Sequence, residues 1–325
     1  MIITQTPLRI SFAGGGTDLR EYYGLSGGAV VSTAIDKYIF VIVKQRFDRK
    51  IRIGYSRTEM ADSVEEIEHE LVREAMRLVG ISEGIEISTM ADIPSEGSGL
   101  GSSSAVTVGL LHALYAYKGE LVTPDRLAEE ACHIEIDILG KPIGKQDQYI
   151  AAFGGLRHFV FHPDDRVTVE SVALRDSDRL RFGESLLLFF TGITRRADTI
   201  LTEQKSNTGA KRDTLDRLKA QTHEIHEALT CGNLNRIGRI LDEGWRFKRS
   251  LTERISNTEI DQLYERALDA GATGGKIAGA GGGGFLLLFC PPDRQKAVRE
   301  ALHDYQELPF SLERDGTKVI FNVRR

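Results

Sequence analysis

The chain has 325 residues, 41% of them hydrophobic and 27% charged, so it can bury one large core or two of ordinary size. A net charge of −5 and a pI of about 6.0 argue against the basic surface that broad nucleic-acid binding needs. No apolar run is long enough to cross a bilayer, and the first residues lack the pattern of a signal peptide. We therefore expect a cytoplasmic protein with no membrane partner.

Apolar spacing divides the first 150 residues into strands and helices. We expect strands at 4–12, 29–43 (as more than one strand), 51–55 and 85–90, and helices at 63–78, 102–117 and 124–138. Thr123 followed by Pro124 is a typical helix start, with a capping hydroxyl and a proline at the first helical position. A loop at 92–101 leads into the helix at 102–117.

The second half also mixes the two kinds of element. We expect strands at 156–161, 167–172, 186–191, 285–289 and 318–323, and helices at 195–206, 213–231, 234–251, 260–270 and 293–306. Such mixing in both halves indicates two α+β or α/β units. We predict an α+β fold class with two domains, residues 1–165 and 166–325.

The most informative motif is the glycine- and serine-rich run at 94–105, which opens a predicted helix. A helix N-terminus presents unpaired N–H groups and a partial positive charge, and glycines let an anion approach the backbone. The run lacks the Gly-Lys-Ser/Thr ending of a P-loop, so a different phosphate cradle is indicated. The ordinary alternative is a linker or a helix cap.

A second glycine run, at 279–284, formally matches the dinucleotide-binding pattern G-x-G-x-x-G. That fingerprint follows a strand and opens a helix, whereas this run precedes an apolar strand. We reject the dinucleotide interpretation. We expect this run to bring bare backbone close to a substrate or to the first glycine loop.

Three segments, in this order along the chain, together resemble the motifs of the GHMP kinase superfamily. They are Pro7 to Asp18, similar to its N-terminal substrate motif; Pro94 to Ala105, similar to its ATP-phosphate loop; and Gly275 to Gly284, similar to its C-terminal glycine motif. The resemblance implies a two-domain fold. Its N-terminal α/β domain is ribosomal S5 domain 2-like, its C-terminal α+β domain is ferredoxin-like, and the site lies between them.

Two details resemble a particular branch of this superfamily. The variant Ala13-Gly14-Gly15-Gly16-Thr17-Asp18 and the segment 144–149 are similar to those of D-glycero-D-manno-heptose 7-phosphate kinases and of the kinase portion of fucose-salvage enzymes. The short chain and its opening favour the heptose enzymes. The resemblance implies ATP-dependent phosphorylation of the anomeric C1 hydroxyl, giving a 1,7-bisphosphate for nucleotide-activated heptose synthesis.

The same motifs imply roles for individual residues. Asp147 matches the catalytic aspartate, as base or as the group that orients the hydroxyl, and Arg9 matches the basic residue near it. The ATP-phosphate loop implies nucleotide contacts from Pro94, Gly97, Ser98, Gly99, Leu100, Gly101, Ser102, Ser103 and Ser104.

Ser103 and Glu135 match the Mg²⁺ ligands of the family, with the exact serine uncertain by one position and Asp137 as the rival carboxylate. Because residues two apart on a helix face different ways, at most one of the two carboxylates should face the site.

The substrate side of the site is predicted from the first and last motifs and from one strand end. Gly15, Gly16, Thr17 and Asp18 match the sugar-binding segment. A distal phosphate needs cations and helix N-termini, for which Arg195, Arg196, Lys276 and Arg20 are candidates. The complete predicted substrate set is Gly15, Gly16, Thr17, Asp18, Gly192, Arg195, Lys276, Gly281 and Gly282.

Three other functions stay open at the level of sequence. One is a kinase for fucose or another unphosphorylated sugar, which differs only in lacking a distal-phosphate pocket. Another is a ligand sensor that has lost catalysis, which the presence of Asp147, Ser103 and Glu135 disfavours. A third, a mevalonate kinase, shares the phosphate loop but not the Gly-Gly-Gly-Thr-Asp variant. The expected partners are ATP and a small sugar phosphate, with a homodimer left open.

Overall fold

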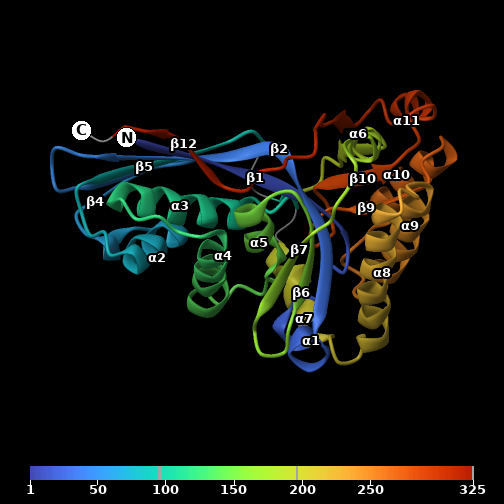
Figure 1. Ribbon diagram of the computed structural model, residues 1–325, viewed down its shortest axis with the longest axis horizontal. Helices are drawn as coiled ribbons and strands as arrows, with labels where there is room; N and C mark the ends of the chain where they lie inside the picture. Colours follow the sequence, from blue (N-terminus) through green and yellow to red (C-terminus); the bar gives the residue numbers. More distant parts are fainter. Residues whose placement is uncertain (94–96, 195–196, 324–325) are drawn as a thin grey trace.

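The computed structural model describes residues 1–93, 97–194 and 197–323. Its first half is built on an eight-stranded sheet in which β12, β1, β2, β5, β3 and β4 follow one another, while β6 pairs with both β2 and β7 (Figure 1). All the pairings are antiparallel except that of β3 with β5. The strands are β1 (Ile2–Ala13), β2 (Gly28–Gln45), β3 (Ile51–Gly54), β4 (Thr58–Ala61), β5 (Ile85–Ala91), β6 (Leu156–Phe161), β7 (Val167–Ser171) and β12 (Lys318–Asn322).

Strand β2 organises this sheet. We predicted several strands between residues 29 and 43, but the β-branched and aromatic residues there form one strand of 18 residues. One end of β2, residues 28–33, pairs with β6, and the other, residues 39–45, pairs with β5. The register of β1 against β2 shifts between Pro7 and Leu8. Such an irregularity bends a strand, and here it places Arg9 at the point where the sheet divides.

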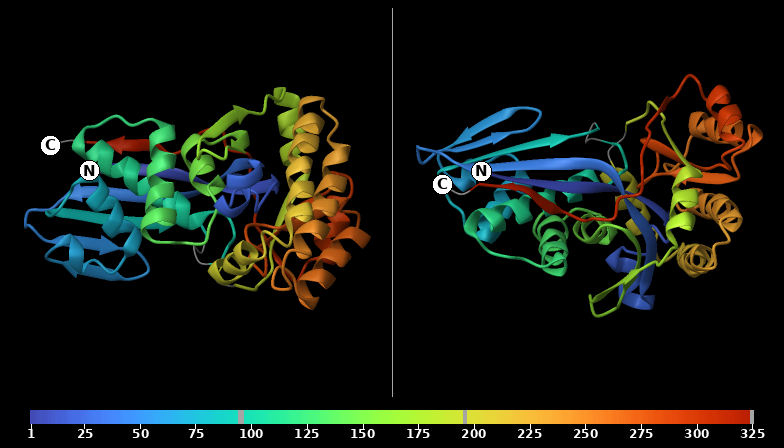
Figure 2. Two further views of the ribbon diagram at one scale, coloured as in Figure 1. Left: turned by 90° about the horizontal axis from the view of Figure 1, so that it is seen from below. Right: turned by 45° about the horizontal axis from the view of Figure 1, so that its top comes forward.

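Helices cover one face of the sheet (Figures 1 and 2). They are η1 (Val64–Glu66), α2 (Glu70–Val79), α3 (Ser102–Lys118), α4 (Pro124–Cys132), the π-helical turn η2 (His133–Ile138) and α5 (Gln146–Phe153). The Thr123 cap is confirmed, since its hydroxyl accepts a hydrogen bond from Arg126 N. The single helix predicted at 63–78 is wrong. The chain makes one 3₁₀ turn and then starts α2, whose N-terminus is capped by the His69 ring.

The second half has a four-stranded antiparallel sheet in the order β11, β8, β10, β9. Along the chain, helices lie between β8 and β9 and between β10 and β11. This is the ferredoxin-like βαββαβ arrangement, and the predicted α+β class is confirmed. The strands are β8 (Leu186–Phe190), β9 (Gly274–Ile277), β10 (Phe285–Phe289) and β11 (Gln306–Glu307), and the helices are α7 (Ala197–Ser206), α8 (Arg212–Thr230), α9 (Asn235–Arg249), α10 (Thr258–Asp269) and α11 (Gln295–Ala301). Strand β9 lies in the glycine-rich segment to which we had assigned no strand.

The two halves share a hydrophobic core. Helix α8 packs against β1 and β2 on one side and against α9 on the other (Figure 1). Three short helices, α1 (Arg20–Ser26), α5 and α6 (Asp176–Glu184), lie outside our predicted elements. The domain division at residues 165 and 166 stays a prediction. Strands β6 and β7 pair across it, and β12 returns to the first sheet. In the described part of the chain, none of the helices combines the length and apolar character that crossing a membrane requires.

A histidine joins the first sheet to helix α8. His158 on β6 is 4% exposed, its Nδ1 lies 2.9 Å from Glu170 Oε2, and its ring is 5.6 Å and 5.4 Å from the rings of His223 and His226. Burial lowers the pKa of His158, outweighing the opposite effect of Glu170. The folded state thus holds His158 neutral, whereas the unfolded chain takes up a proton below pH ~6.5.

We therefore expect the stability supplied by neutral His158 to be present above pH ~6.5 and lost as the pH falls below it. In His158→Gln, the unfolding free energy should fall less steeply between about pH 6.5 and 5.5 than in the wild type. Urea titrations at several pH values measure this slope. The exposed His303, replaced by Gln, is the control. Equal slopes in wild type and His158→Gln would contradict the prediction.

Candidate active site

A cleft of about 760 Å³ lies where the two halves meet. Its walls come from β1, the loop before α3, the segment leading into α5, helices α7 and α9, and the glycine run before β10. Its described lining includes Arg9, Gly15, Gly16, Asp18, Gly97, Ser98, Gly99, Gly101, Ser102, Ser103, Ser104, Glu135, Lys141, Gln146, Asp147, Thr194, Gln204, Lys248, Gly279 and Ala280. Most of the predicted site residues therefore meet in one place.

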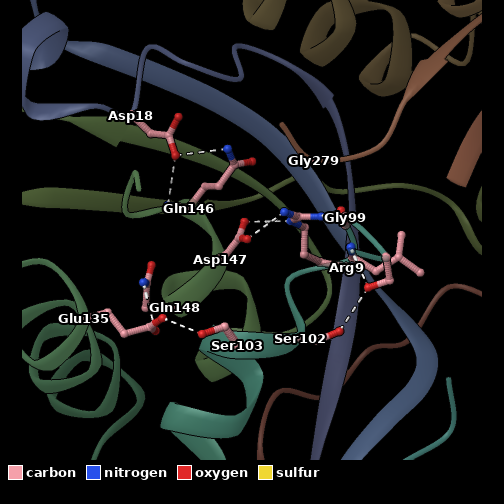
Figure 3. Close-up of polar contacts among 12 residues, drawn as sticks. Arg9, Asp18, Gly99, Ser102, Ser103, Glu135, Gln146, Asp147, Gln148 and Gly279 are labelled. Atoms are coloured by element: carbon pink, nitrogen blue, oxygen red, sulfur yellow. Dashed lines mark hydrogen bonds and ion pairs between the residues drawn. The ribbon is translucent and has the colours of Figure 1, made fainter. Parts of the chain in front are cut away.

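Arg9 and Asp147 face each other in this cleft (Figure 3). Arg9 Nε donates to Asp147 Oδ1 at 2.7 Å and Nη2 donates to Oδ2 at 2.6 Å, which makes a two-pronged ion pair. The remaining guanidinium nitrogen, Nη1, donates to the Gly99 carbonyl oxygen at 2.5 Å. The Arg9 side chain is 6% exposed and that of Asp147 is 22% exposed. The pair is thus fixed in orientation, with one carboxylate edge open to the cleft.

The glycine-serine loop wraps around this pair. Gly97, Gly99 and Gly101 all have left-handed φ angles, of 70°, 72° and 80°. Among the described residues, no side chain caps the N-terminus of α3. The N–H groups of its first turn have no side-chain partner in this part of the chain and can bind an anion in the cleft. Pro94 lies outside the described residues.

The second glycine run touches the first, one of the two contacts predicted for it. A Cβ atom on Gly279 would lie 2.7 Å from the Gly99 carbonyl oxygen, and one on Gly284 would lie 2.5 Å from the Ser98 carbonyl oxygen. Only glycine permits this backbone-to-backbone contact. Gly281 and Gly282, predicted to bind substrate, instead pack against Ile255, so it is Gly279 and Ala280 that line the cleft.

Ser103 and Glu135 are in contact. Ser103 Oγ donates to Glu135 Oε2 at 3.0 Å, and Gln148 Nε2 donates to Glu135 Oε1 at 3.1 Å. Burial raises the pKa of Glu135, while the Lys141 charge acts in the opposite direction. The rival carboxylate, Asp137, is exposed and lies beside His133. A hydroxyl and a carboxylate on one cleft wall fit Mg²⁺, which takes oxygen ligands and keeps bound water and phosphate.

If Ser103 and Glu135 hold Mg²⁺, Ser103→Ala and Glu135→Gln should each raise the Mg²⁺ concentration for half-maximal activity by about tenfold or more. The reason is that Ser103→Ala removes an oxygen ligand and Glu135→Gln removes the negative charge of another, while both side chains stay close to their original size. Mg²⁺ titrations of turnover at saturating ATP measure the effect. Asp137→Asn, on the same turn but exposed, is the control. Titration curves unchanged in both variants would remove these residues from the metal site.

The predicted sugar-binding segment divides into two groups. Asp18 is buried and accepts hydrogen bonds from Gly16 N at 3.0 Å and Gln146 Nε2 at 3.0 Å. Burial raises the pKa of Asp18, and the nearby Asp147 charge raises it further. Gly15, Gly16 and Asp18 line the cleft. Thr17 does not, because its fully buried hydroxyl bonds the Gly14 and Ala29 backbone.

The described residues that were predicted to bind a distal phosphate do not line the cleft. Lys276 on β9 is buried and is not among the described residues that line the cleft. Burial lowers the pKa of Lys276, and the charges of Lys248 and Arg9 lower it further. Gly192 has a left-handed φ of 75° but does not line the cleft, whereas Thr194 does. Arg20 instead pairs with Asp165. Arg195 and Arg196 lie outside the described residues.

Several cleft residues had no role predicted from the sequence, and three of them are polar and buried. Gln146 and Gln204 have buried side-chain atoms, Oε1 and Nε2 respectively, without a hydrogen-bond partner in the described chain. Lys248 brings a buried cation from helix α9. Gln146 lies in the segment 144–149 but was given no role there, whereas Gln204 and Lys248 belong to no motif and only the folded arrangement of α7 and α9 reveals them.

A free helix N-terminus in a glycine-serine loop, facing an arginine-held carboxylate, is the site of an enzyme that transfers a phosphoryl group to a hydroxyl. Residues 69–155 match the GHMP kinases N terminal domain, and residues 224–307 match the GHMP kinases C terminal domain. The chain belongs to the GHMP kinase family.

Named relatives agree with this assignment. A D-glycero-alpha-D-manno-heptose 7-phosphate kinase of Campylobacter jejuni is 32% identical, with 98% of each chain covered. Among solved structures, a D-glycero-D-manno-heptose 1-phosphate kinase from Bacteroides thetaiotaomicron superposes with a TM-score of 0.84 at 25% identity and full coverage of both chains. A putative sugar kinase from Campylobacter jejuni gives 0.80 at 30% identity, covering 98% of this chain and 97% of that one.

Proposed function

We propose that this protein is an ATP-dependent sugar kinase that phosphorylates the anomeric hydroxyl of D-glycero-D-manno-heptose 7-phosphate. The product would be the 1,7-bisphosphate, made in the cytoplasm for nucleotide-activated heptose. The observation that carries the kinase chemistry is the Arg9–Asp147 pair opposite the N-terminus of α3. The choice of sugar is supported by the relative with 32% identity.

The proposed reaction uses the chain's residues as follows. The N–H groups at the start of α3 and the loop at 97–101 hold the ATP phosphates. Asp147 accepts the proton of the sugar hydroxyl, or orients that hydroxyl, as its oxygen bonds to the γ-phosphorus. Arg9 fixes both carboxylate oxygens of Asp147 and supplies positive charge at the reacting centre. Mg²⁺, held by Ser103 and Glu135, would neutralise phosphate charge.

Part of the cleft wall suits a substrate rich in hydroxyl groups. Asp18 offers a carboxylate, and Gln146 and Gln204 offer a carbonyl oxygen and an amide nitrogen that have no partner among the described residues. Buried polar atoms without partners are unfavourable unless a ligand completes them. A sugar carries donors and acceptors on neighbouring carbons and can satisfy all three groups.

Turnover of ATP with Mg²⁺ against heptose 7-phosphate, fucose, galactose, mannose and mevalonate tests the proposal. Turnover confined to the heptose phosphate is the expected result. Turnover with an unphosphorylated sugar would favour the fucose-type alternative, whose relative in Bacteroides fragilis is 26% identical, with this chain covering 35% of that protein. Nucleotide binding without turnover on any of them would favour a ligand sensor.

A further inference from the structure

Lys248 is a buried cation that the chemistry described above does not use. It lies in the last turn of α9, is 5% exposed and lines the cleft. Its Nζ donates to the Gly279 carbonyl oxygen. Within residues 1–93, 97–194 and 197–323, it forms no ion pair with a carboxylate. An ammonium group has three donors, so two of them have no partner in this part of the chain.

The surroundings place Lys248 beside the reacting groups. Gly279, which accepts its hydrogen bond, packs backbone to backbone against Gly99, and Gly99 accepts a hydrogen bond from Arg9 Nη1. These contacts link the ammonium group of Lys248, through two glycine backbones, to the guanidinium that holds Asp147.

Charges of both signs act on Lys248. Burial lowers the pKa of Lys248 to about 8, Arg9 lowers it, and Asp18 and Asp147 raise it. Asp147 is already paired with Arg9, and Asp18 accepts hydrogen bonds from Gly16 and Gln146. The two remaining donors of the ammonium group therefore lack an acceptor among the described residues, and an anion bound in the cleft could supply one.

We propose that Lys248 is a catalytic residue whose ammonium group donates a hydrogen bond to a non-bridging oxygen of the γ-phosphoryl group as it transfers. The inference rests on the proposed kinase function. In the step, the sugar oxygen bonds to the γ-phosphorus and its proton passes to Asp147. The bond from phosphorus to the β-γ bridging oxygen breaks, and its electrons stay with ADP. Lys248 remains protonated throughout.

The rival role for Lys248 is to bind the distal phosphate of the sugar substrate. The charges that act on Lys248 are those of Arg9, Asp18 and Asp147, which belong to both parts of the site. The reacting centre is favoured because Gly279, the acceptor of Lys248 among the described residues, abuts the phosphate loop. The two roles separate in kinetics. Contact with the transferring group affects kcat, whereas contact with a remote phosphate affects KM alone.

Lys248→Met, which keeps the length of the side chain, should lower kcat by about 10²–10³-fold. Because an unpaired buried charge is removed, the melting temperature should stay the same or rise. Arg246→Met, an exposed position on the same helix, is the matched control. A loss confined to the KM of the sugar phosphate, or kcat within threefold of the wild type, would overturn the proposal.

The pH profile gives a second readout. Because kcat/KM reports ionisations of the free enzyme, it should fall in the wild type as Lys248 loses its proton above pH about 8. Lys248→Arg, which stays charged, should keep part of the activity and lose this basic limb. If kcat/KM of Lys248→Arg fell above pH about 8 as it does in the wild type, the proposed catalytic role of Lys248 would be contradicted.

A binding measurement separates failure of this inference from failure of the proposed substrate. Calorimetry with ATP and with ADP needs no sugar. Lys248→Met should weaken the binding of ATP more than that of ADP, since only ATP carries the γ-phosphoryl group. An equal effect on both would overturn the role of Lys248 even if the enzyme phosphorylates a different sugar. An intact wild type without turnover on any sugar would instead refute the proposed function.

Discussion

Replacing Asp147 by Asn is expected to lower kcat by about 10²–10⁴-fold while leaving ATP binding intact. The amide cannot take the proton of the attacking hydroxyl and places a donor nitrogen opposite one prong of Arg9. Asp147 has one carboxylate edge open to the cleft. The loss of turnover should appear in the folded protein, although Asn also leaves the nearly buried Arg9 without its anionic partner and should lower the free energy of unfolding. Steady-state kinetics and nucleotide titration on the same preparation measure both quantities.

Asp137→Asn is the matched control for this variant, since it makes the same chemical change at an exposed helical position. We expect it to keep the activity of the wild type. If Asp147→Asn retained full turnover, Asp147 could be neither the base nor the group that orients the hydroxyl.

Replacing Arg9 by Met should reduce both activity and stability. Activity should fall by about 10²–10³-fold, because the carboxylate loses its orientation and the reacting centre loses positive charge. The unfolding free energy should fall by about 3 kcal/mol, because a nearly buried ion pair loses one partner. Kinetics and urea denaturation measure the two effects. A variant as stable as the wild type would show that the pair contributes nothing to folding.

Arg9→Lys refines the experiment, because lysine keeps the charge but lacks the planar fork that bonds both Asp147 oxygens and Gly99. Compared with Arg9→Met, Arg9→Lys should restore more of the lost free energy of unfolding than of the lost activity. In the double variant Arg9→Met with Asp147→Asn, the losses of activity should be far from additive, since the two side chains act as one unit. Additive losses would mean that they act independently.

Local patterns in the sequence predicted most of the elements, because strand alternation, helical spacing and caps are properties of neighbouring residues. The Thr123 cap, and the strand before and the helix after the first glycine loop, illustrate this. The merged strand β2 and the split helix at 63–78 depended instead on tertiary partners. Strand β6 and strand β5 extend β2 from opposite ends, and the His69 ring that caps α2 packs edge-on against the Tyr55 ring, with 4.7 Å between their centroids.

The site divides in the same way. Residues within motifs, such as Asp147, Ser103 and Asp18, were predicted and meet in the cleft. Lys248 and Gln204 come from the amphipathic helices α9 and α7, where a lysine or glutamine is ordinary composition. Only their burial against the cleft distinguishes them. Gly281 and Gly282 show the opposite case, in which residues of a motif were predicted to bind substrate but do not line the cleft. A glycine run predicts close backbone approach without indicating which residue faces the cleft.

Strand β12 has a consequence for how the protein is made. It pairs with the first residues of β1, and the Met1 amino group donates to the Val323 carbonyl oxygen at 2.6 Å. At a synthesis rate of roughly 5–20 residues per second, the β1 edge waits tens of seconds for its partner. Until then, its N–H and C=O groups can pair with another nascent chain. Aggregation during expression should therefore respond to this edge more than to any residue of the cleft.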